Sequence, residues 1–229
     1  MRAILLAAGF GTRLRPLTDS VPKCLVPVKG RPLLGVWLER LTDAGFGPFL
    51  VNTHYLREKV DAFIASTPYH NLVRMVHEPC LLGTAGTLLH NMSFFEGRDG
   101  LLIHADNYCL ADLSAFRAAH HCRPIGCEIT MLTFRTDTPS SCGIVQVDRD
   151  NVVREFHEKV ANPPGNLANG AVYLLSAAAM EEIRAHHGTE IDFSTGILPR
   201  FIGRIQSHET VETFIDVGTP ETYALANAA

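Results

Sequence analysis

The stretch Leu6-Ala7-Ala8-Gly9-Phe10-Gly11-Thr12-Arg13-Leu14 decides how this sequence folds, because an apolar run there opens into a turn with two glycines. The run from Ala3 to Ala8 predicts a buried strand. Glycine backbone N–H groups can approach phosphate oxygens with no Cβ in the way, and Arg13 adds a forked cation. We therefore predict a phosphate-binding loop from Gly9 to Lys23.

Two better-known glycine loops do not fit this stretch. A dinucleotide-binding fingerprint would place a glycine where Leu14 stands. A Walker loop would continue as Gly-Lys-Ser or Gly-Lys-Thr, which is absent. A bare Gly-x-Gly after a strand is often only a tight connection, so support for phosphate binding must come from the rest of the chain.

Composition excludes several classes of partner. The chain has 229 residues, 46% of them hydrophobic, which predicts one compact domain with a substantial core. Its net charge of −4 argues against nucleic acid or a membrane surface as the main partner. The six cysteines form no C-x-x-C pair, which indicates reduced thiols and a cytoplasmic protein. No apolar run approaches the ~20 residues needed to cross a bilayer.

The first half of the chain alternates short apolar runs with amphipathic stretches. This alternation predicts an α/β fold: an open, mostly parallel, Rossmann-like sheet of short buried strands, with helices on both faces and ligands at the carboxyl ends of the strands. After Gly126 the sequence becomes β-rich, which predicts a smaller, more antiparallel lobe that completes the sheet. We expect a single domain with two halves, residues 1–125 and residues 126–229. The expected strands are 3–8, 49–52, 73–76, 101–104, 144–147, 152–156 and 171–175, and the expected helices are 33–44, 57–65, 177–186 and 219–228.

The extended loop sequence resembles the sugar-phosphate nucleotidyltransferases. Their signature is close to G-x-G-T-R-L-x-P-L-T followed by P-K-x-L-x-P-V, and this chain reads G-F-G-T-R-L-R-P-L-T and P-K-C-L-V-P-V. Cys24 departs from the usual proline, and we expect its side chain to be packed. The resemblance implies that Lys23 reaches the α-phosphate and acts in catalysis with Arg13. It also implies a set of contacts to the triphosphate: Leu6, Ala8, Gly9, Gly11, Thr12 and Arg13.

Two aspartates are suited to a metal ion. Moving a nucleotidyl group requires the triphosphate charge to be neutralised, and Mg²⁺ held by carboxylates is the usual device. Asp106 follows an apolar run, and Asp216 lies in F-I-D-V-G-T-P-E, which resembles the family's W/F-x-D-I/V-G-T-P-E element. The resemblance implies that both bind Mg²⁺, with Asn107 close to the substrate. An alternative is that Asp216 or Thr219 only caps the last helix, and for Thr219 we expect this to hold.

Two later motifs resemble the family's sugar-binding elements. F-H-E-K-V resembles F-x-E-K-P, and N-G-A-V-Y is an altered form of N-A-G-I-Y. The resemblance implies that Glu158 binds sugar hydroxyls and that Lys159 holds the acceptor phosphate. Taken alone, a Glu-Lys pair is usually a solvated surface pair. The further residues expected to bind the substrate are Gly143, Asn169 and Gly170.

One motif bears on the base. The run from Leu82 to Gly86 resembles the family's L-G-T-A-G element near the base and ribose, especially that of mannose-1-phosphate and heptose-1-phosphate guanylyltransferases. This implies nucleotide contacts by Gly83, Thr84 and Gly86 and favours GTP. The alternative is an ordinary helix start capped by Thr84.

The resemblance implies an enzyme that joins a nucleoside triphosphate and a sugar 1-phosphate, with release of pyrophosphate. It also implies that residues 1–125 form the nucleotide-binding half and that residues 126–229 form the β-rich, sugar-binding half, which completes the metal site. Ala105-Asp106-Asn107 leaves open a cytidylyl- or uridylyltransferase that acts on phosphocholine or an amino sugar phosphate. A non-catalytic, nucleotide-sensing regulatory subunit is a third possibility, although the charged residues of the motifs are all present. The His120-His121-Cys122 run with Cys127 lacks two separated ligand pairs, so we expect no structural zinc there.

Overall fold

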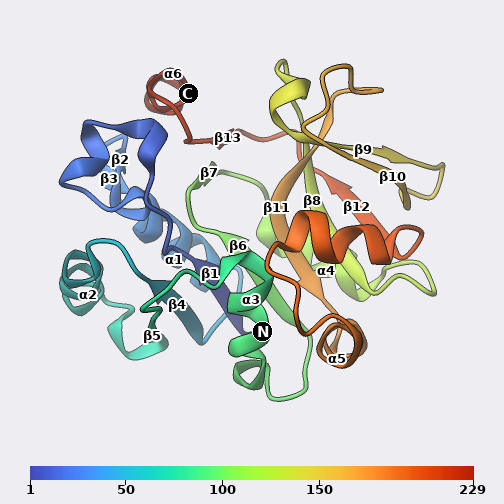
Figure 1. Cartoon of the computed structure of the whole chain (residues 1–229), viewed down its shortest axis with the longest axis horizontal. Helices are drawn as coiled ribbons and strands as arrows, with labels where there is room; N and C mark the ends of the chain where they lie inside the picture. Colours follow the sequence, from blue (N-terminus) through green and yellow to red (C-terminus); the bar gives the residue numbers. More distant parts are fainter. The chain divides into compact units, whose positions relative to one another are not determined.

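The computed structural model describes residues 1–229, and the chain forms two compact units that interleave in sequence (Figure 1). The first unit comprises residues 1–81, 103–113 and 212–229, and the second comprises residues 82–102 and 114–211. One consequence is that Asp216 belongs to the same unit as Lys23 and Asp106.

The first unit carries the parallel part of the sheet. Strands β1, β4 and β5 lie side by side in parallel, with Leu6 opposite Asn52 and Asn52 opposite Val76. Two small antiparallel ladders join β2 to β3 and β7 to β13. The elements are β1 (Ala3–Leu6), β2 (Pro27–Val28), β3 (Arg31–Pro32), α1 (Leu33–Asp43), β4 (Phe49–Thr53), α2 (Arg57–Ser66), β5 (Val73–His77), β7 (Asn107–Cys109), β13 (Phe214–Asp216) and α6 (Pro220–Ala228), and β6 (Gly100–His104) runs from the second unit into the first.

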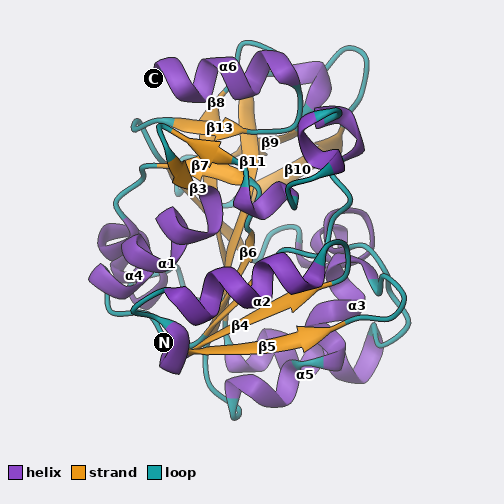
Figure 2. Cartoon of the chain, turned by 90° about the vertical axis from the view of Figure 1, so that its left-hand side faces the viewer, coloured by secondary structure: helices purple, strands orange, loops and turns teal.

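Burial in this sheet matches the predicted apolar runs in β1 and β4 but not in β5. Every residue of β4 is buried, whereas β5 is partly exposed throughout. β5 ends the strand order and has only β4 as a neighbour, so it is an edge strand and not the doubly covered strand that was expected. Figure 2 shows α2 beside β4 and β5.

Helix α1 follows from its apolar spacing. Leu34, Trp37, Leu38 and Leu41 recur at helical spacing and are almost fully buried. The helix ends before Gly45, whose φ of 74° is a left-handed conformation that glycine adopts without steric cost. The predicted helix and its glycine stop are confirmed.

A small apolar cluster in the first unit ties the site segments together. Leu14 from the end of the loop, Tyr108 from β7 and Val217 after β13 are all buried in it. Side chains from α1 and α6 complete this cluster. Burial of this apolar surface is the main force that holds segments so distant in sequence next to each other.

The second unit is mainly antiparallel, which agrees with the predicted β-rich lobe. Strand β9 pairs with β10, and β11 pairs with β8 and β9, while β12 runs parallel to β8. The predicted helix at 177–186 is confirmed as α5, which begins where the Ser176 hydroxyl accepts the Ala179 N–H. The elements are α3 (Gly83–His90), α4 (Leu113–His121, whose first residue lies in the first unit), β8 (Ile129–Arg135), β9 (Gly143–Val147), β10 (Val153–Glu158), β11 (Leu167–Leu175), α5 (Ala177–His186) and β12 (Ile205–Glu209).

The α/β class predicted from the sequence is confirmed, with parallel strands concentrated in the first unit. None of the helices has the length and apolar character that a membrane crossing would require.

Trp37 anchors β7 to α1. Its indole N–H donates to the Asn107 carbonyl at 2.9 Å, and the side chain is 1% exposed. We predict that Trp37→Phe lowers the free energy of unfolding by about 1–3 kcal/mol, because the buried Asn107 carbonyl loses the indole N–H as a donor. Urea unfolding with matched slopes would measure the change. An unchanged midpoint would contradict this role.

Candidate functional site

The predicted phosphate loop leaves β1 and closes onto Lys23. Gly11 has a φ of 65°, and a Cβ there would lie 3.0 Å from both the Lys23 Cβ and the Thr18 Cγ2. The Thr18 hydroxyl donates to the Gly11 carbonyl at 2.7 Å, and a short 3₁₀ turn over Thr12–Leu14 follows. Position 11 favours glycine, because a side chain there would strain the left-handed backbone and crowd the stem of Lys23.

At its entrance the loop is exposed. Gly9 is solvent-exposed, and a Cβ added there would meet nothing within 4 Å. Leu6 is half-buried at the end of β1, and Ala8 is buried. The segment therefore presents backbone at the carboxyl end of β1, the edge at which a parallel sheet binds ligands.

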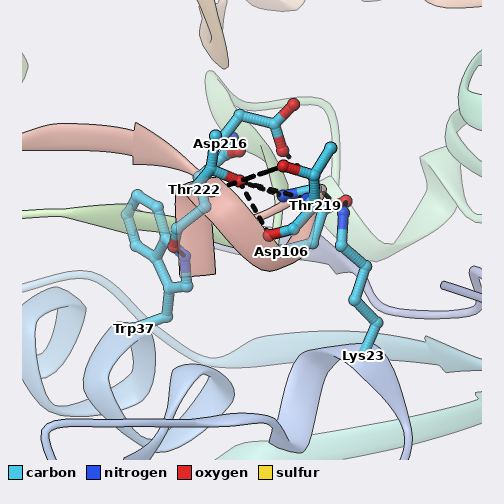
Figure 3. A network of polar contacts seen from close by, with 8 residues as sticks. Lys23, Trp37, Asp106, Asp216, Thr219 and Thr222 are labelled. Atoms are coloured by element: carbon cyan, nitrogen blue, oxygen red, sulfur yellow. Dashed lines mark hydrogen bonds and ion pairs between the residues drawn. The ribbon is translucent and has the colours of Figure 1, made fainter. Parts of the chain in front are cut away.

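Lys23, Asp106 and Asp216 converge within the first unit (Figure 3). The Lys23 Nζ lies 2.5 Å from the Asp106 Oδ2 and 3.8 Å from the Asp216 Oδ1. The lysine side chain is only 10% exposed, whereas the Asp106 and Asp216 side chains are 34% and 54% exposed. The two carboxylates can thus contact solvent or a ligand, whereas the lysine side chain is largely buried.

Arg13 adds a second positive charge to this group. A Cβ at Gly218 would lie 3.1 Å from the Arg13 Nη2 and 3.2 Å from the Asp216 Oδ2, so the guanidinium and the carboxylate share the space over Gly218. Two cations and two carboxylates therefore meet at one place. Such a cluster is suited to binding an anionic ligand together with a cation.

The two carboxylates differ in their protonation behaviour. Burial by itself raises the pKa of Asp106, but the charges of Lys23 and His104 and the lysine hydrogen bond outweigh it, so the pKa is lowered overall. Desolvation in the cluster, reinforced by the charge of Asp106, raises the pKa of Asp216 against the opposing pull of Lys23 and Arg13. Asp106 is thus the member more firmly held as a carboxylate.

Backbone and hydroxyl contacts brace Asp216. The Gly218 N–H donates to the Asp216 carbonyl at 2.9 Å, and the Thr222 hydroxyl oxygen lies 3.1 Å from the N–H groups of Gly218 and Thr219. Thr219 caps α6 in a capping box with Thr222, as expected for Thr219. Figure 3 shows both threonines next to Asp216. Asp216 itself is not the cap.

The pair of aspartates fits a magnesium ion. No group of three or more His, Cys, Asp or Glu side chains forms a metal site. Mg²⁺ is, however, often held by one or two carboxylates together with substrate phosphates and water. Two carboxylates that already share one ammonium group are a donor set of this kind. Asn107, the next residue in the chain, is buried in β7 and paired with Asp216 in the ladder.

In the second unit, Gly143, Glu158 and Lys159 come together. Gly143 pairs with Glu158 in the ladder of β9 and β10, and a Cβ at Gly143 would lie 2.5 Å from the Glu158 Oε2. The Lys159 Nζ lies 3.2 Å from the Glu158 Oε1, and the lysine side chain is 65% exposed. The structure therefore forms the predicted Glu-Lys pair at the end of β10, with the lysine projecting into solvent.

Asn169 is held by its own strand. Its Nδ2 donates to the Tyr173 hydroxyl at 2.7 Å, and its Oδ1 accepts the Ala171 N–H at 2.9 Å. Burial raises the pKa of Tyr173. Gly170 lies between Asn169 and Ala171 in a bulge of β11, where the register with β8 shifts. Tyr173 was not among the predicted site residues, although its place as the last residue of the N-G-A-V-Y element could have indicated it.

Ala171 has a φ of 53°, a left-handed backbone conformation. It occupies the middle of the N-G-A-V-Y element, where the family pattern N-A-G-I-Y has a glycine. A residue with a Cβ in this conformation carries a cost of about 1 kcal/mol. The departure from the pattern therefore leaves local strain in β11.

The start of α3 is held by a backbone carbonyl. The Ala85 and Gly86 N–H groups lie 2.9 and 3.4 Å from the Ile191 carbonyl oxygen. The Thr84 hydroxyl accepts the Phe193 N–H at 2.7 Å and lies 3.4 Å from the Asp192 Oδ2. Thr84 does not cap the helix, because Leu82 is the N-cap residue and no side chain caps it. The helix start is thus tied to residues 191–193.

Two other sequence features have structural roles. Cys24 is buried as expected, and burial raises the pKa of its thiol to about 12. His120 is buried and its Nδ1 lies 2.8 Å from the Thr130 hydroxyl. Desolvation of this ring, with the nearby charge of Arg123, lowers the pKa of His120 to about 4.

Comparisons with known proteins place the chain among nucleotide-transferring enzymes. A family model described as nucleotidyl transferase matches residues 2–229. A mannose-1-phosphate guanyltransferase of Pichia angusta is 29% identical over 232 residues, which cover 97% of this chain and 62% of that protein. A glucose-1-phosphate thymidylyltransferase of Streptomyces griseus is 29% identical over 223 residues, covering 95% and 58%. The chain thus spans about three fifths of the length of these curated relatives.

A solved structure is similar over nearly its whole length. The crystal structure of HddC from Yersinia pseudotuberculosis complexed with GMP-PN has a TM-score of 0.82 at 26% identity, and the match covers 99% of this chain and 98% of that chain.

The left-handed backbone of Ala171 leads to a stability prediction. We expect Ala171→Gly to raise the free energy of unfolding by about 0.5–1 kcal/mol, because glycine relieves the strain. Ala168→Gly is the matched control: Ala168 lies in the same strand, is fully buried and has no positive φ, so its replacement should destabilise. Thermal unfolding of both variants measures the difference, and a lower midpoint for Ala171→Gly would count against the strain.

The tight start of α3 leads to a second stability prediction. Gly83 has a φ of 76°, and a Cβ there would lie 2.4 Å from the Ile191 carbonyl oxygen, whereas Gly97 has a φ of 67° and open space around it. We expect Gly97→Ala to cost about 1 kcal/mol and Gly83→Ala clearly more, because only the second adds a clash to the unfavourable angle. Equal losses in urea unfolding would show that the clash relaxes at no cost.

Proposed function

Because the chain belongs to the nucleotidyl transferase family, we propose that it transfers a nucleoside monophosphate from a nucleoside triphosphate to a sugar 1-phosphate, with release of pyrophosphate. The observation that carries this proposal is the convergence of Lys23, Asp106 and Asp216 next to the loop after β1. We favour GTP, since similar proteins include mannose-1-phosphate guanyltransferases and a structure complexed with GMP-PN.

The loop and its cations bind the triphosphate in this proposal. Backbone N–H groups from Gly9 to Thr12 approach the phosphate oxygens, which the glycines permit. Arg13 and Lys23 supply positive charge, and Lys23 faces the α-phosphate, where charge develops during transfer. Lys23 is suited to this role because its stem is packed against Gly11 and its ammonium group is placed by the two aspartates.

The same aspartates would hold the metal ion. Asp106 and Asp216 are the residues we assign to Mg²⁺, which when bound would neutralise charge on the triphosphate. Asp106 is the stronger candidate of the two, since its lowered pKa keeps it ionised.

The proposed reaction is a direct in-line transfer. A phosphate oxygen of the sugar 1-phosphate forms a bond to the α-phosphorus, and the bond from that phosphorus to the oxygen of the β-phosphate breaks, so that pyrophosphate leaves. The attacking phosphate oxygen is already ionised at neutral pH, so no general base is needed. Positioning and charge stabilisation then supply most of the rate. We assign Glu158 and Asn169 to the sugar, and Lys159 to its phosphate.

The proposal also covers the domain organisation, the cellular compartment and the remaining predicted site residues. We infer a single nucleotidyltransferase domain that acts in the cytoplasm on small molecules, supported by six free cysteines and by the absence of a basic excess. Asn107, Gly143 and Gly170 stand next to the assigned substrate residues. We assign the contact with the base to the start of α3, at Gly83, Thr84 and Gly86. The Gly86 N–H and the Thr84 hydroxyl already contact residues 191–193, so other groups of these residues would bind the base.

A substrate matrix tests the proposal. Purified protein with Mg²⁺ is incubated with each of the four common triphosphates, crossed with a panel of sugar 1-phosphates, an amino sugar phosphate and phosphocholine, and pyrophosphate is measured. We expect release with GTP and a sugar 1-phosphate. Release only with CTP and phosphocholine would move the acceptor to another class. Triphosphate binding without release from any pair would support a regulatory subunit.

Variants of the charged cluster provide the residue-level prediction. Lys23→Ala and Asp106→Asn should each lower kcat by a factor on the order of 10²–10³, as for the loss of a preorganised electrostatic group. Arg149→Ala and Asp150→Asn, which are exposed in the turn between β9 and β10, are matched controls that should retain activity. Steady-state pyrophosphate release measures all four. Near-normal turnover of Asp106→Asn would remove Asp106 from the metal site.

A further inference from the structure

We propose that Asn52, held in one orientation by Glu78, is a positioning residue that fixes the start of the phosphate loop. The inference rests on the proposed function only in what the loop binds. It concerns three residues at the carboxyl ends of neighbouring parallel strands: Ala7 directly after β1, Asn52 in β4 and Glu78 directly after β5.

A buried chain of hydrogen bonds crosses the three strands. The Ala7 N–H donates to the Asn52 Oδ1 at 2.7 Å, and the Asn52 Nδ2 donates to the Glu78 Oε1 at 2.9 Å. Ala7, Asn52 and Glu78 are 8%, 3% and 2% exposed. Groups so deeply buried can act on a ligand only through the backbone that they hold.

The chain of contacts determines which way the Asn52 amide points. The backbone N–H of Ala7 can only donate, so the amide oxygen must face it. The amide nitrogen then faces Glu78, which offers an acceptor. A flipped amide would put two donors and two acceptors in opposition, and this would cost both hydrogen bonds. Glu78 therefore selects the orientation in which Asn52 can hold Ala7.

Ala7 is held two residues before the exposed Gly9. A Cβ added at Gly9 would meet nothing within 4 Å, and farther along the loop the Gly11 carbonyl accepts from the Thr18 hydroxyl. The loop is thus held at two ends, by Asn52 and by Thr18. A displaced Ala7 would shift the loop entrance relative to Lys23, which packs against the other end.

Glu78 has a second contact that acts in the same direction. Its carbonyl lies 2.7 Å from the His54 Nδ1, and the His54 ring lies edge-on to the Phe10 ring with centroids 5.2 Å apart. Phe10 is the residue between the two glycines of the loop. Asn52 in β4 and His54 directly after it therefore contact the loop at Ala7 and at Phe10. Glu78 contacts both Asn52 and His54.

The test replaces one group at a time without changing side-chain size. Asn52→Asp keeps the acceptor for Ala7 but turns a second carboxyl group toward Glu78. Glu78→Gln keeps an acceptor for Asn52. In the double variant Asn52→Asp/Glu78→Gln, the new amide at position 78 can donate to the new carboxylate at position 52. Calorimetry with GTP and Mg²⁺ gives the dissociation constant of each protein, and thermal unfolding gives its stability.

We expect Asn52→Asp to weaken GTP binding about tenfold, since loss of one buried hydrogen bond corresponds to a change of that order. Glu78→Gln should stay within about threefold of wild type, and the double variant should recover most of the loss. The KM for the sugar phosphate should not change. If Asn52→Asp lowers the melting temperature but leaves GTP binding intact, the contact is merely structural and the proposal is wrong.

A second measurement does not depend on binding or turnover. Trypsin can cut after the exposed Arg13 once buried Leu14 is released, so the cleavage rate at this bond reports on the order of the loop. It should rise in Asn52→Asp and fall back in the double variant. Asn52→Ser replaces Asn52→Asp if that variant does not fold. The serine hydroxyl is too short to bridge Ala7 and Glu78, so the cleavage rate should rise in this variant as well. If Asn52→Asp is cleaved faster but the wild-type protein releases no pyrophosphate with any substrate pair, the proposed function is wrong and the positioning of the loop by Asn52 stands. If wild type and all variants are cleaved at the same rate, the positioning is wrong.

Discussion

The ion pair between Lys23 and Asp106 is the constraint on which the rest of the site depends. It joins groups 83 residues apart in sequence, and Asp216 approaches the same ammonium group from a third segment. Two carboxylates held close together repel each other unless a cation lies near both. The lysine fills this place and thereby holds together the residues that we propose to bind phosphate and a metal ion. The apolar cluster containing Leu14, Tyr108 and Val217 holds the same three segments together.

Residues outside the charged cluster position the segments that carry it. Trp37 holds the carbonyl next to Asp106, Thr222 braces the turn after Asp216, and Asn52 holds the backbone before Gly9. Each of them contacts the main chain of a segment that carries site residues. Such backbone contacts stabilise the geometry of a site, because its side chains are placed only as precisely as the main chain that carries them.

The second unit contains the clearest departure of this chain from the family pattern. Ala171 adopts a left-handed conformation at a position where the pattern has glycine, and the register of β11 with β8 shifts between Asn169 and Tyr173. At the start of α3 the glycines do have a steric reason, since the Ile191 carbonyl lies where a Cβ at Gly83 would be. Family glycines can thus serve the packing of the chain as much as the approach of a ligand.

The sequence by itself determined the α/β class, the buried strands β1 and β4, and helix α1 with its glycine stop. It also singled out Lys23, Asp106 and Asp216, the charged residues that meet in the structure. Apolar periodicity and motif spacing are local properties and can be recognised without the fold. Only the tertiary structure decided that residues 212–229 return to the first unit, that β5 is an exposed edge, and that Asn52 and Glu78 hold the loop. The physical reason is that a buried polar group is satisfied by whichever partner the fold brings near it. For Ala7 that partner lies 45 residues away, beyond the reach of any local pattern.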